Sequence, residues 1–396
     1  MNGNDIVIVS ATRTAIGKFG GQFATTSAIE LGTTVAKAAI QKANLSPEQI
    51  DTVIFGNVLQ AGLGQNPARQ VGLGAGLSHA STAVTINEVC GSGLKAIISA
   101  AQVLRLGDAK IVLAGGMENM SLAPHLLQQR FAPKNGPVTL VDSLFNDGLT
   151  DAYSQDPMGI TAENIVEKYG FTREEQDAFA VASQQKAAKA QAEGRFASEI
   201  TPVAVFNRKT KSDDLKVTDE FIRPNTNLES LSVLKPSFKK DGTVTAGNAS
   251  GINDGAACVI MTTREYATEL GLPILATLKG YAEAGVDPSI MGIGPVPAIQ
   301  KLVARTRIPL EKVDVFELNE AFAAQSMAVI KDLKIPTEKV NPFGGAIALG
   351  HPIGASGTRI VVTLINALDQ LDGKIGVASL CVGGGIGVAI AIEREK

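Results

Sequence analysis

Short runs rich in valine and isoleucine alternate along the chain with longer segments whose apolar residues recur at helical spacing. One helical segment places a set of apolar residues on a single face: Leu94, Ile97, Ile98, Ala101 and Leu104. A later segment does the same with Ile360, Leu364, Ala367 and Leu368. Strands that alternate with helices of this kind predict an α/β fold in which each helix packs an apolar face against a sheet.

Several of these elements occur twice, in the same order and at nearly constant spacing. The run "SPEQIDTVIFGNV" corresponds to "PLEKVDVFELNEA", so that Asp314 stands 263 positions after Asp51. The helical segment "SGLKAIISAAQVL" corresponds to "SGTRIVVTLINAL", the strand "KIVLAGG" to "KIGVASL", and the first strand "DIVIVSATRTAIG" to "LPILATLKGYAEAG". Such a repeat predicts two similar halves stacked in one molecule.

The segment 122–249 has no counterpart in the second half and is richer in charge and loop residues. Within it, Thr172 followed by Glu175 predicts the capped start of a helix that stops at Gly194. The polar stretch after that helix predicts a surface loop or a short hairpin. We therefore expect a first half formed by 1–121 and 250–271, a second half formed by 272–396, and an inserted lobe that acts as a lid or ligand clamp.

The composition is that of a globular protein with a large core, since 45% of the 396 residues are hydrophobic and 19% are charged. A formal net charge of −3, without a long lysine or arginine run, argues against nucleic acid or a membrane as the main partner. No apolar run reaches the roughly 18 residues of a membrane span. The three cysteines lack a CxxC spacing, which favours free thiols in a reducing compartment. We expect a cytoplasmic protein that binds a small molecule and no metal.

Cys90 lies between an apparent strand, "TAVTINEV", and a helix that begins near Ser92. The free N–H groups and the positive dipole end of a helix start favour a thiolate, and the glycines on both sides of Ser92 allow a ligand to approach the backbone. The alternative is an inert core residue, because free cysteine is among the most buried residue types. The local sequence leaves both interpretations open.

The glycine-rich loop "NPFGGAIALGHPIGASG" occupies the place in the second half that the Cys90 loop has in the first. His351 stands in this loop just before the matching helix, opposite the candidate nucleophile of the first half. Its alternative is a structural histidine held by hydrogen bonds. His79 and His125 have no comparable setting, so we expect them to have no chemical role.

Two further loops offer candidate chemistry. Cys381 ends a strand in "SLCVGGGIG", where the glycines leave room for a substrate and expose amides that could bind an oxyanion. Asn319 ends a strand in "ELNEAFAAQ", although asparagine at that place is often only a turn or cap residue. Cys258 lies inside an apolar run and is expected to be structural.

Taken together, "NEVCGSGLKA", "GGMENMS", "GNASGINDGAA", "NEAFAAQ", "GGAIALGHPIGASG" and "CVGGGIG" closely resemble the thiolase family, and within it the acetyl-CoA C-acetyltransferases. The motifs appear in the family's order and span nearly the whole chain. The resemblance implies the thiolase fold: two βαβαβαββ-type halves in a five-layered α/β/α/β/α core, with an inserted loop domain that holds coenzyme A.

The resemblance also implies roles for the candidate residues. Cys90 would attack an acyl-CoA thioester to form an acyl-enzyme, and His351 would take its proton or hold the thiolate. Cys381 would remove a proton from the methyl carbon of a second acetyl-CoA. Asn319 would orient a water that stabilises the enolate together with His351, while the amides of Cys90 and Gly383 would bind the tetrahedral oxyanion. The reaction would join two acetyl-CoA into acetoacetyl-CoA and CoA, reversibly and by a ping-pong mechanism.

For the coenzyme, the resemblance places one set of residues along the pantetheine and its tunnel: Ser250, Ala249, Leu149, Met158, Ala321 and Phe322. A second set would lie near the nucleotide: Arg223, Ser230, Ser237 and Phe238. CoA thioesters would be substrates, so no resident cofactor is expected. Two departures from the family pattern, Pro157 and Phe343, put the preferred acyl chain length in doubt.

Three alternatives remain at this stage. A degradative 3-ketoacyl-CoA thiolase with broader chain length shares every catalytic residue, and Pro157 mildly favours it. A ketosynthase of the same fold usually needs a second active-site histidine, whereas position 319 is asparagine. A non-catalytic acyl-CoA or lipid carrier would not need both Cys90 and Cys381. The resemblance further suggests a homodimer or homotetramer.

Overall fold

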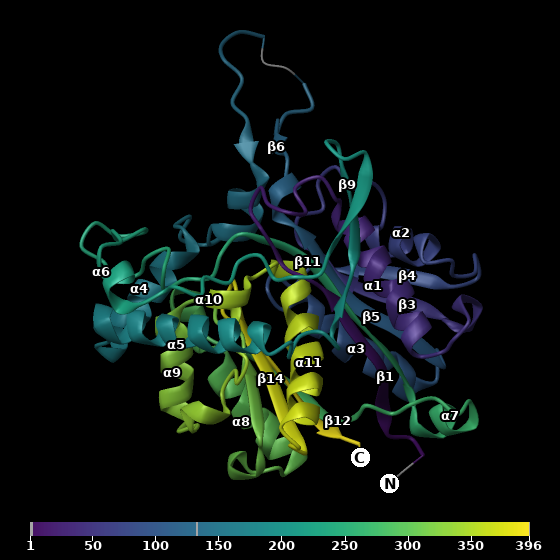
Figure 1. The fold of residues 1–396 in the computed structure, drawn as a ribbon. Coiled ribbons are helices and arrows are strands. Elements are labelled where there is room, and N and C mark those ends of the chain that lie inside the picture. Colours follow the sequence, from purple (N-terminus) through teal and green to yellow (C-terminus); the bar gives the residue numbers. More distant parts are fainter. Residues whose placement is uncertain (1–2, 132–133, 396) are drawn as a thin grey trace.

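The fold rests on strands that repeat in the two halves of the chain (Figure 1). The computed structural model describes residues 3–131 and 134–395, so residues 1–2 and 396 of the expected halves, and 132–133 of the expected insertion, lie outside the described residues. The first-half strands are β1 (Ile6–Thr14), β3 (Thr52–Gly56), β4 (Thr82–Ile86), β5 (Ile111–Asn119) and β11 (Asn253–Thr263). The second-half strands are β12 (Ala276–Gly285), β13 (Val315–Leu318), β14 (Ile375–Val382) and β15 (Ile386–Arg394).

Strand pairing follows the same rule in both halves. In the first, parallel β3 and β5 are followed by antiparallel β11 and β1; in the second, parallel β13 and β14 are followed by antiparallel β15 and β12. β1 and β12 pair only at Val7 with Thr277 and at Ile8 with Ala276, which joins the halves. β4 extends the first half at its edge beside β3, and the short strands β2 (Gly17–Lys18) and β8 (Ile200–Thr201) join β11 and β1.

Equivalent aspartates in the two halves make equivalent bonds, as the repeat predicts. Asp51 Oδ2 accepts the backbone N–H groups of Lys110 and Ile111 at 2.7 and 2.9 Å. Asp314 Oδ2 accepts those of Lys374 and Ile375 at 2.8 and 2.9 Å. Each carboxylate therefore ties the turn before one strand to the start of its parallel neighbour.

Helices cover and separate the two sheet halves in five layers, which confirms the expected thiolase fold. The outer helices of the first half are α1 (Ala28–Lys42) and α2 (Pro67–Gly74), and those of the second are α8 (Pro295–Thr306) and α9 (Ala323–Leu333). Between the sheets, α3 (Ser92–Leu106) packs against α11 (Ile353–Gln370). The shorter helical segments are η1 (Pro47–Gln49), η2 (Met120–Leu122), α7 (Arg264–Glu269), η4 (Pro288–Ile293), η5 (Leu310–Lys312), η6 (Thr337–Lys339) and α10 (Ala346–Leu349).

The central helix α11 differs from the expected one-faced pattern because nearly all of it is buried, including Ser356, Thr358 and Arg359. It lies between two sheets and α3, so no face remains for solvent. Thr358 Oγ1 donates to Gly93 O of α3 at 2.9 Å, and a side chain at Gly357 would collide with the α3 backbone. The α3 region is apolar and long enough to cross a membrane by length and composition alone, but 56% of it is buried in this core.

The insertion packs on the two halves along several elements: β6 (His125–Leu126), β7 (Val141–Asp142), η3 (Leu144–Leu149), α4 (Met158–Tyr169), α5 (Arg173–Ala192), β9 (Val203–Asn207), β10 (Ser212–Lys216) and α6 (Leu228–Ser232). The predicted capping box is present, with Thr172 and Glu175 bonding each other's backbone N–H. The polar stretch forms the β9–β10 hairpin. The segment around β6 extends away from the body (Figure 1), whereas α5 packs against α9 and α10 of the second half.

Candidate active site

Cys90 sits in a sharp turn between β4 and α3. The residue before it, Val89, has a φ of 47°, in the left-handed region that a β-branched side chain rarely adopts. Ser92 holds the turn, since its hydroxyl donates to Val89 O at 2.6 Å and accepts the N–H of Glu88 at 2.9 Å. The turn points the thiol at the backbone N–H groups of Gly383 and of Cys90 itself.

Burial raises the pKa of the Cys90 thiol to about 11, although the N–H groups of Gly383 and Cys90 lower it in part. The N–H groups therefore favour the thiolate in the expected direction, but desolvation of the charged form outweighs them in the free protein. Cys90 rests as a thiol and needs a base to become a nucleophile.

His351 supplies such a base. Burial lowers its pKa to about 3, so the ring is neutral. Its Nδ1 lies 2.5 Å from Ser356 Oγ, and the Ser356 hydroxyl donates to Pro352 O at 2.9 Å. Because a hydroxyl has a single hydrogen, Nδ1 must donate to Ser356, which leaves the lone pair on Nε2. Among the described residues Nε2 has no hydrogen-bond partner and is free to accept a proton.

The His351 loop is also fixed through its backbone, and Asn319 lies beside its ring. The His351 N–H donates to Asn253 Oδ1 at 2.9 Å, and Asn253 Nδ2 donates to Gly17 O of β2 at 3.0 Å. Asn319, at the end of β13, places its Nδ2 3.5 Å from His351 Nδ1. Its Oδ1 is buried without a partner within residues 3–131 and 134–395. Asn319 thus brings an unused acceptor to the imidazole.

Cys381 completes the group at the end of β14. Its side chain is fully buried, which raises the pKa of its thiol strongly, and the neighbouring Cys90 raises it further. The two cysteines therefore lie within electrostatic reach of each other. Gly383 follows two residues later and gives its backbone N–H to Cys90, so β14 and the loop after it serve both cysteines.

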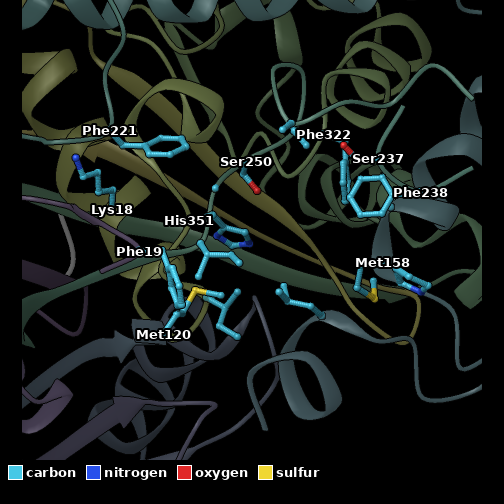
Figure 2. A pocket seen from close by; sticks show the side chains of 18 of the residues that line it. Lys18, Phe19, Met120, Met158, Phe221, Ser237, Phe238, Ser250, Phe322 and His351 are labelled. Atoms are coloured by element: carbon cyan, nitrogen blue, oxygen red, sulfur yellow. The ribbon is translucent and has the colours of Figure 1, made fainter. Parts of the chain in front are cut away.

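A cavity of about 490 Å³ leads to this group. Figure 2 shows His351 in the middle of the lining, with Lys18 and Phe221 on one side and Phe238 and Met158 on the other. Many of the predicted coenzyme residues line it: Ala249, Ser250, Leu149, Met158, Arg223, Ser237, Phe238 and Phe322. Lys18 and Arg223 are the ionised side chains of the lining, and both are cations. The cavity therefore suits a molecule with an apolar body and an anionic end.

Two predicted coenzyme residues lie outside that lining. Ala321 is buried, and its carbonyl accepts the Ser250 N–H at 2.9 Å. Ser230 is exposed on α6, where its hydroxyl donates to Asn227 O at 2.8 Å. Ala321 thus acts by holding the Ser250 loop, and Ser230 by capping a helix.

The cysteines adjoin the cavity through shared packing. Cys90 packs with Leu149 and Ile353, and Cys381 packs with Met158 and Phe322. All four of these neighbours line the cavity. His351 lines the cavity itself, and the two cysteines belong to or pack against hydrophobic clusters that contribute residues to its lining.

Sequence reasoning missed several lining residues: Lys18, Phe19, Met120, Phe145, Phe221, Ile252 and Ile353. Lys18 and Phe19 stand beside paired glycines in "GKFGG", a signal of a tight turn that could have flagged them. It also missed Asn253, Ser356 and Glu118, each inside a motif that was recognised as a whole.

The two departures from the family pattern fall in different places. Pro157 lines the cavity and precedes α4. Phe343 is buried elsewhere, with its ring edge-on to Phe196 at 6.2 Å between centroids. Of the two, only Pro157 lines the cavity.

The remaining cysteine and histidines have structural settings. Cys258 is fully buried, and its thiol donates to Val35 O at 3.1 Å. His79 is exposed, and His125 lies 3.9 Å from Asp142 on the surface. Within the part of the chain that the structure describes, no group of three or more His, Cys, Asp or Glu side chains could hold a metal ion.

The chain matches two family descriptions, the thiolase N-terminal domain over residues 6–265 and the thiolase C-terminal domain over residues 272–394. It is 56% identical to an acetyl-CoA acetyltransferase of Cupriavidus necator, over 99% of this chain and 100% of that protein. It is 54% identical to an acetyl-CoA acetyltransferase of Chromobacterium violaceum, over 98% and 100%.

Two solved structures are similar over nearly their full length. The Bacillus anthracis acetyl-CoA acetyltransferase has a TM-score of 0.96 at 44% identity, covering 99% of both chains. Human mitochondrial 3-ketoacyl-CoA thiolase has a TM-score of 0.95 at 42% identity, covering 100% of both. With its five layers, its paired cysteines and these matches, the chain belongs to the thiolase family.

Proposed function

We propose that the protein is an acetyl-CoA C-acetyltransferase that joins two acetyl-CoA into acetoacetyl-CoA and CoA, reversibly and through an acetyl-Cys90 intermediate. The observation that supports this proposal is a neutral imidazole in the lining of a cavity that also carries Lys18 and Arg223, together with two neighbouring thiols that pack beside residues of the same lining. An acyl-CoA has the matching form: a thioester, an apolar and amide arm, and phosphates at its far end.

In the first half-reaction His351 Nε2 takes the proton of Cys90, and the sulfur attacks the thioester carbonyl. The oxyanion accepts the N–H groups of Cys90 and Gly383, which already face the sulfur. When the tetrahedral intermediate collapses, the acyl carbon keeps its bond to Cys90. The departing CoA thiolate receives the proton held by His351, which returns the imidazole to its neutral form.

In the second half-reaction Cys381 removes a proton from the methyl carbon of a new acetyl-CoA. The enolate oxygen is stabilised by His351 and by a water that Asn319 Oδ1 holds. The carbanion attacks the acetyl group on Cys90, the carbon–carbon bond forms and the Cys90 thiolate leaves. Before the methyl proton is removed, His351 Nε2 would accept the proton of the Cys381 thiol, whose high pKa makes the resulting thiolate a strong base. His351 would return that proton to the Cys90 thiolate as it leaves, so that both cysteines end as thiols.

The insertion 122–249 would be the CoA-binding domain. Arg223 lines the cavity, with its guanidinium 5.1 Å from the centre of the Phe221 ring, and would bind a phosphate of the coenzyme. Ser237 and Phe238 would border the nucleotide, while Ala249, Ser250 and Met158 would follow the pantetheine. Ser230 would then act beside the nucleotide from α6.

The degradative alternative, a 3-ketoacyl-CoA thiolase for longer chains, differs only in the acyl chain accepted. Thiolysis of acetoacetyl-CoA is compared with thiolysis of a 10-carbon 3-ketoacyl-CoA at equal concentration, the longer chain being roughly the length such an enzyme takes. The proposal predicts a higher kcat/KM for acetoacetyl-CoA. Preference for the longer substrate would assign the degradative role instead.

Replacing Cys381 with serine separates the half-reactions and tests the remaining alternatives. Cys381→Ser should still acquire an acetyl group on Cys90 from acetyl-CoA but lose condensation, since a hydroxyl is a far weaker acid at this place. Normal condensation in this variant would refute the role of Cys381. CoA binding without any covalent adduct would favour a carrier on the same fold.

We further propose that the substrates and products are acetyl-CoA, acetoacetyl-CoA and CoA, with no resident cofactor. The protein would act in the cytoplasm as a homotetramer or homodimer. The relatives named acetyl-CoA acetyltransferase support the proposed substrates.

A further inference from the structure

Glu118 is a buried carboxylate beside the active site for which the mechanism above has no use. It stands near the carboxyl end of β5, in the motif "GGMENMS", with no exposed surface. Burial raises the pKa of Glu118 to about 7, while the N–H groups it accepts lower it in part. Its charge also adds to the rise in the pKa of the Cys90 thiol, so the carboxylate lies within electrostatic reach of the nucleophile.

Both oxygens of Glu118 are filled by donors from two distant segments. Oε1 accepts Asn57 Nδ2 at 2.8 Å and the Leu59 N–H at 3.1 Å. Oε2 accepts the Val58 N–H at 3.1 Å and the Gly354 N–H at 2.9 Å. Glu118 therefore joins the loop after β3 to the first turn of α11.

Each of these segments carries a part of the site. Gly354 stands three residues after His351. Val58 and Leu59 belong to the cluster against which Cys90 and Leu149 pack. The α11 start has no side-chain cap of its own, so Glu118 acts as the acceptor for that helix end from another strand.

β5 and the start of α11 pack so closely that no residue larger than glycine fits between them at Gly354 or Gly116. A side chain at Gly354 would place its Cβ 2.7 Å from Glu118 Oε2, and one at Gly116 would collide with Gly354 O. In the internal repeat Gly354 corresponds to Cys90 and Glu118 to Val382, each 264 positions apart. The bond from Gly354 to Glu118 is thus the counterpart of the contact between Cys90 and the loop at Gly383.

We propose that Glu118 is a positioning residue that fixes the start of α11, and with it His351, relative to Cys90. Without this carboxylate the imidazole and the thiol lose their mutual placement, although each remains in the cavity. The inference rests on the proposed function, because its consequence is the rate at which His351 activates Cys90.

The test uses Glu118→Gln in the full-length protein. All four groups that bond Glu118 are donors, two at each oxygen. The glutamine amide has only one oxygen, so it can accept from one pair, while its NH₂ group is a donor placed against the donors of the other pair. We expect kcat to fall about 10- to 100-fold with the KM for acetyl-CoA within about 3-fold, the signature of lost alignment. Alkylation of Cys90 by iodoacetamide at pH 7.5 should slow by a comparable factor, about 10-fold or more.

Asp51→Asn is the matched control, because Asp51 accepts two backbone N–H groups at the opposite end of the same strand. It should leave kcat and the alkylation rate within about 2-fold. If Glu118→Gln does not fold, Asn57→Ala replaces it, since it removes only one of the four bonds. We then expect kcat to fall about 3- to 10-fold at unchanged KM.

A folded Glu118→Gln, or in its place Asn57→Ala, with kcat and alkylation within about 2-fold of the parent protein would overturn the inference. This failure is distinct from failure of the proposed function. In the former, the parent protein is acetylated on Cys90 by acetyl-CoA; in the latter it is not.

Discussion

Ser356 decides which nitrogen of His351 can act as the base. Its hydroxyl donates to Pro352 O and accepts from Nδ1, which leaves Nε2 unprotonated. Because this hydroxyl is fully buried and both of its partners are fixed, it holds the imidazole proton on Nδ1. The tautomer is therefore built into the first turn of α11.

Ser356→Ala should lower kcat by about 10- to 100-fold, because Nδ1 loses its acceptor and the proton is no longer held on that nitrogen. Steady-state kinetics with acetoacetyl-CoA and CoA measure the effect. Thr363→Val is the control, since it removes another buried hydroxyl of α11, one that bonds Glu199. An unchanged kcat in Ser356→Ala would show that the ring keeps its tautomer without this residue.

Burial of neutral His351 should make stability depend on pH. Its pKa is lowered from the ordinary 6.5 to about 3, so between these values the unfolded chain binds a proton that the native state does not. The free energy of unfolding should therefore fall as pH drops from 6.5 toward 3, by up to about 1.4 kcal/mol per pH unit. Urea unfolding of the parent protein and of His351→Asn, at several pH values, measures the slope. The two slopes should differ by the contribution of His351, because the buried carboxyl groups titrate in both proteins. Equal slopes would contradict a neutral buried imidazole.

At the residue scale the sequence identifies which side chains are candidates but not their protonation. The motifs single out Cys90, His351, Cys381 and Asn319; the structure places Asn319 beside His351 and Cys381 near Cys90. The state of Cys90 could not be predicted, because helix dipole and desolvation act in opposite directions and only the amount of burial decides. The role of Glu118 could not be predicted because its hydrogen-bond partners lie far away along the chain. The role of Ser356 could not be predicted because it depends on the direction in which its hydroxyl donates.

At the scale of elements, the paired aspartates give the repeat its most direct test. Asp51 and Asp314 each accept two backbone N–H groups at the start of a parallel strand. Both side chains lie on exposed residues, so water can replace part of each bond after substitution.

Asp51→Ala and Asp314→Ala should each lower the free energy of unfolding by about 1 kcal/mol, and by similar amounts. Denaturant titrations measure both values, with thiolysis activity as the control for an intact site. If one substitution lowered the free energy of unfolding strongly and the other not at all, the two equivalent sets of hydrogen bonds would not contribute equally to stability.

The elements themselves were largely predictable. Thr172 and Glu175 mark the start of α5 because a capping box is a local signal. The repeat predicted the pairing rule of the strands, since equivalent sequence forms equivalent elements. The burial of α11 on all sides was not predictable from its apolar stripe, because it depends on a second sheet that covers the opposite face.

On the scale of the whole molecule, a chain with a net charge of −3 places two cationic side chains, Lys18 and Arg223, in the lining of the cavity that contains His351. Lys18 is paired with Glu220 at 3.6 Å, so Arg223 is the cation of the lining with more charge to offer an anionic substrate.

Arg223→Ala should raise the KM for acetyl-CoA by about 3- to 10-fold, while activity toward S-acetyl-N-acetylcysteamine, which has no phosphate, stays unchanged. Initial rates with both thioesters measure the ratio. Lys37→Ala serves as the control for net charge, since Lys37 is exposed on α1 outside the cavity lining. Equal losses with both substrates would show that Arg223 supports the site and not the phosphates.

The family and the five-layered architecture could be predicted from motifs that run the length of the chain. The shape of the cavity could not, because its lining comes from β2, the insertion and both halves. Phe343 is an example of what the sequence alone does not predict. It departs from the family pattern, but its side chain packs against Phe196 and does not line the cavity.

Covalent catalysis by Cys90 is tested by the mass of the protein after brief incubation with acetyl-CoA, followed by peptide mapping. We expect one acetyl group on Cys90 that disappears when CoA is added, and no adduct in Cys90→Ala. An unmodified Cys90 in a protein that binds CoA, or an acetyl group on Cys381 instead, would contradict this expectation.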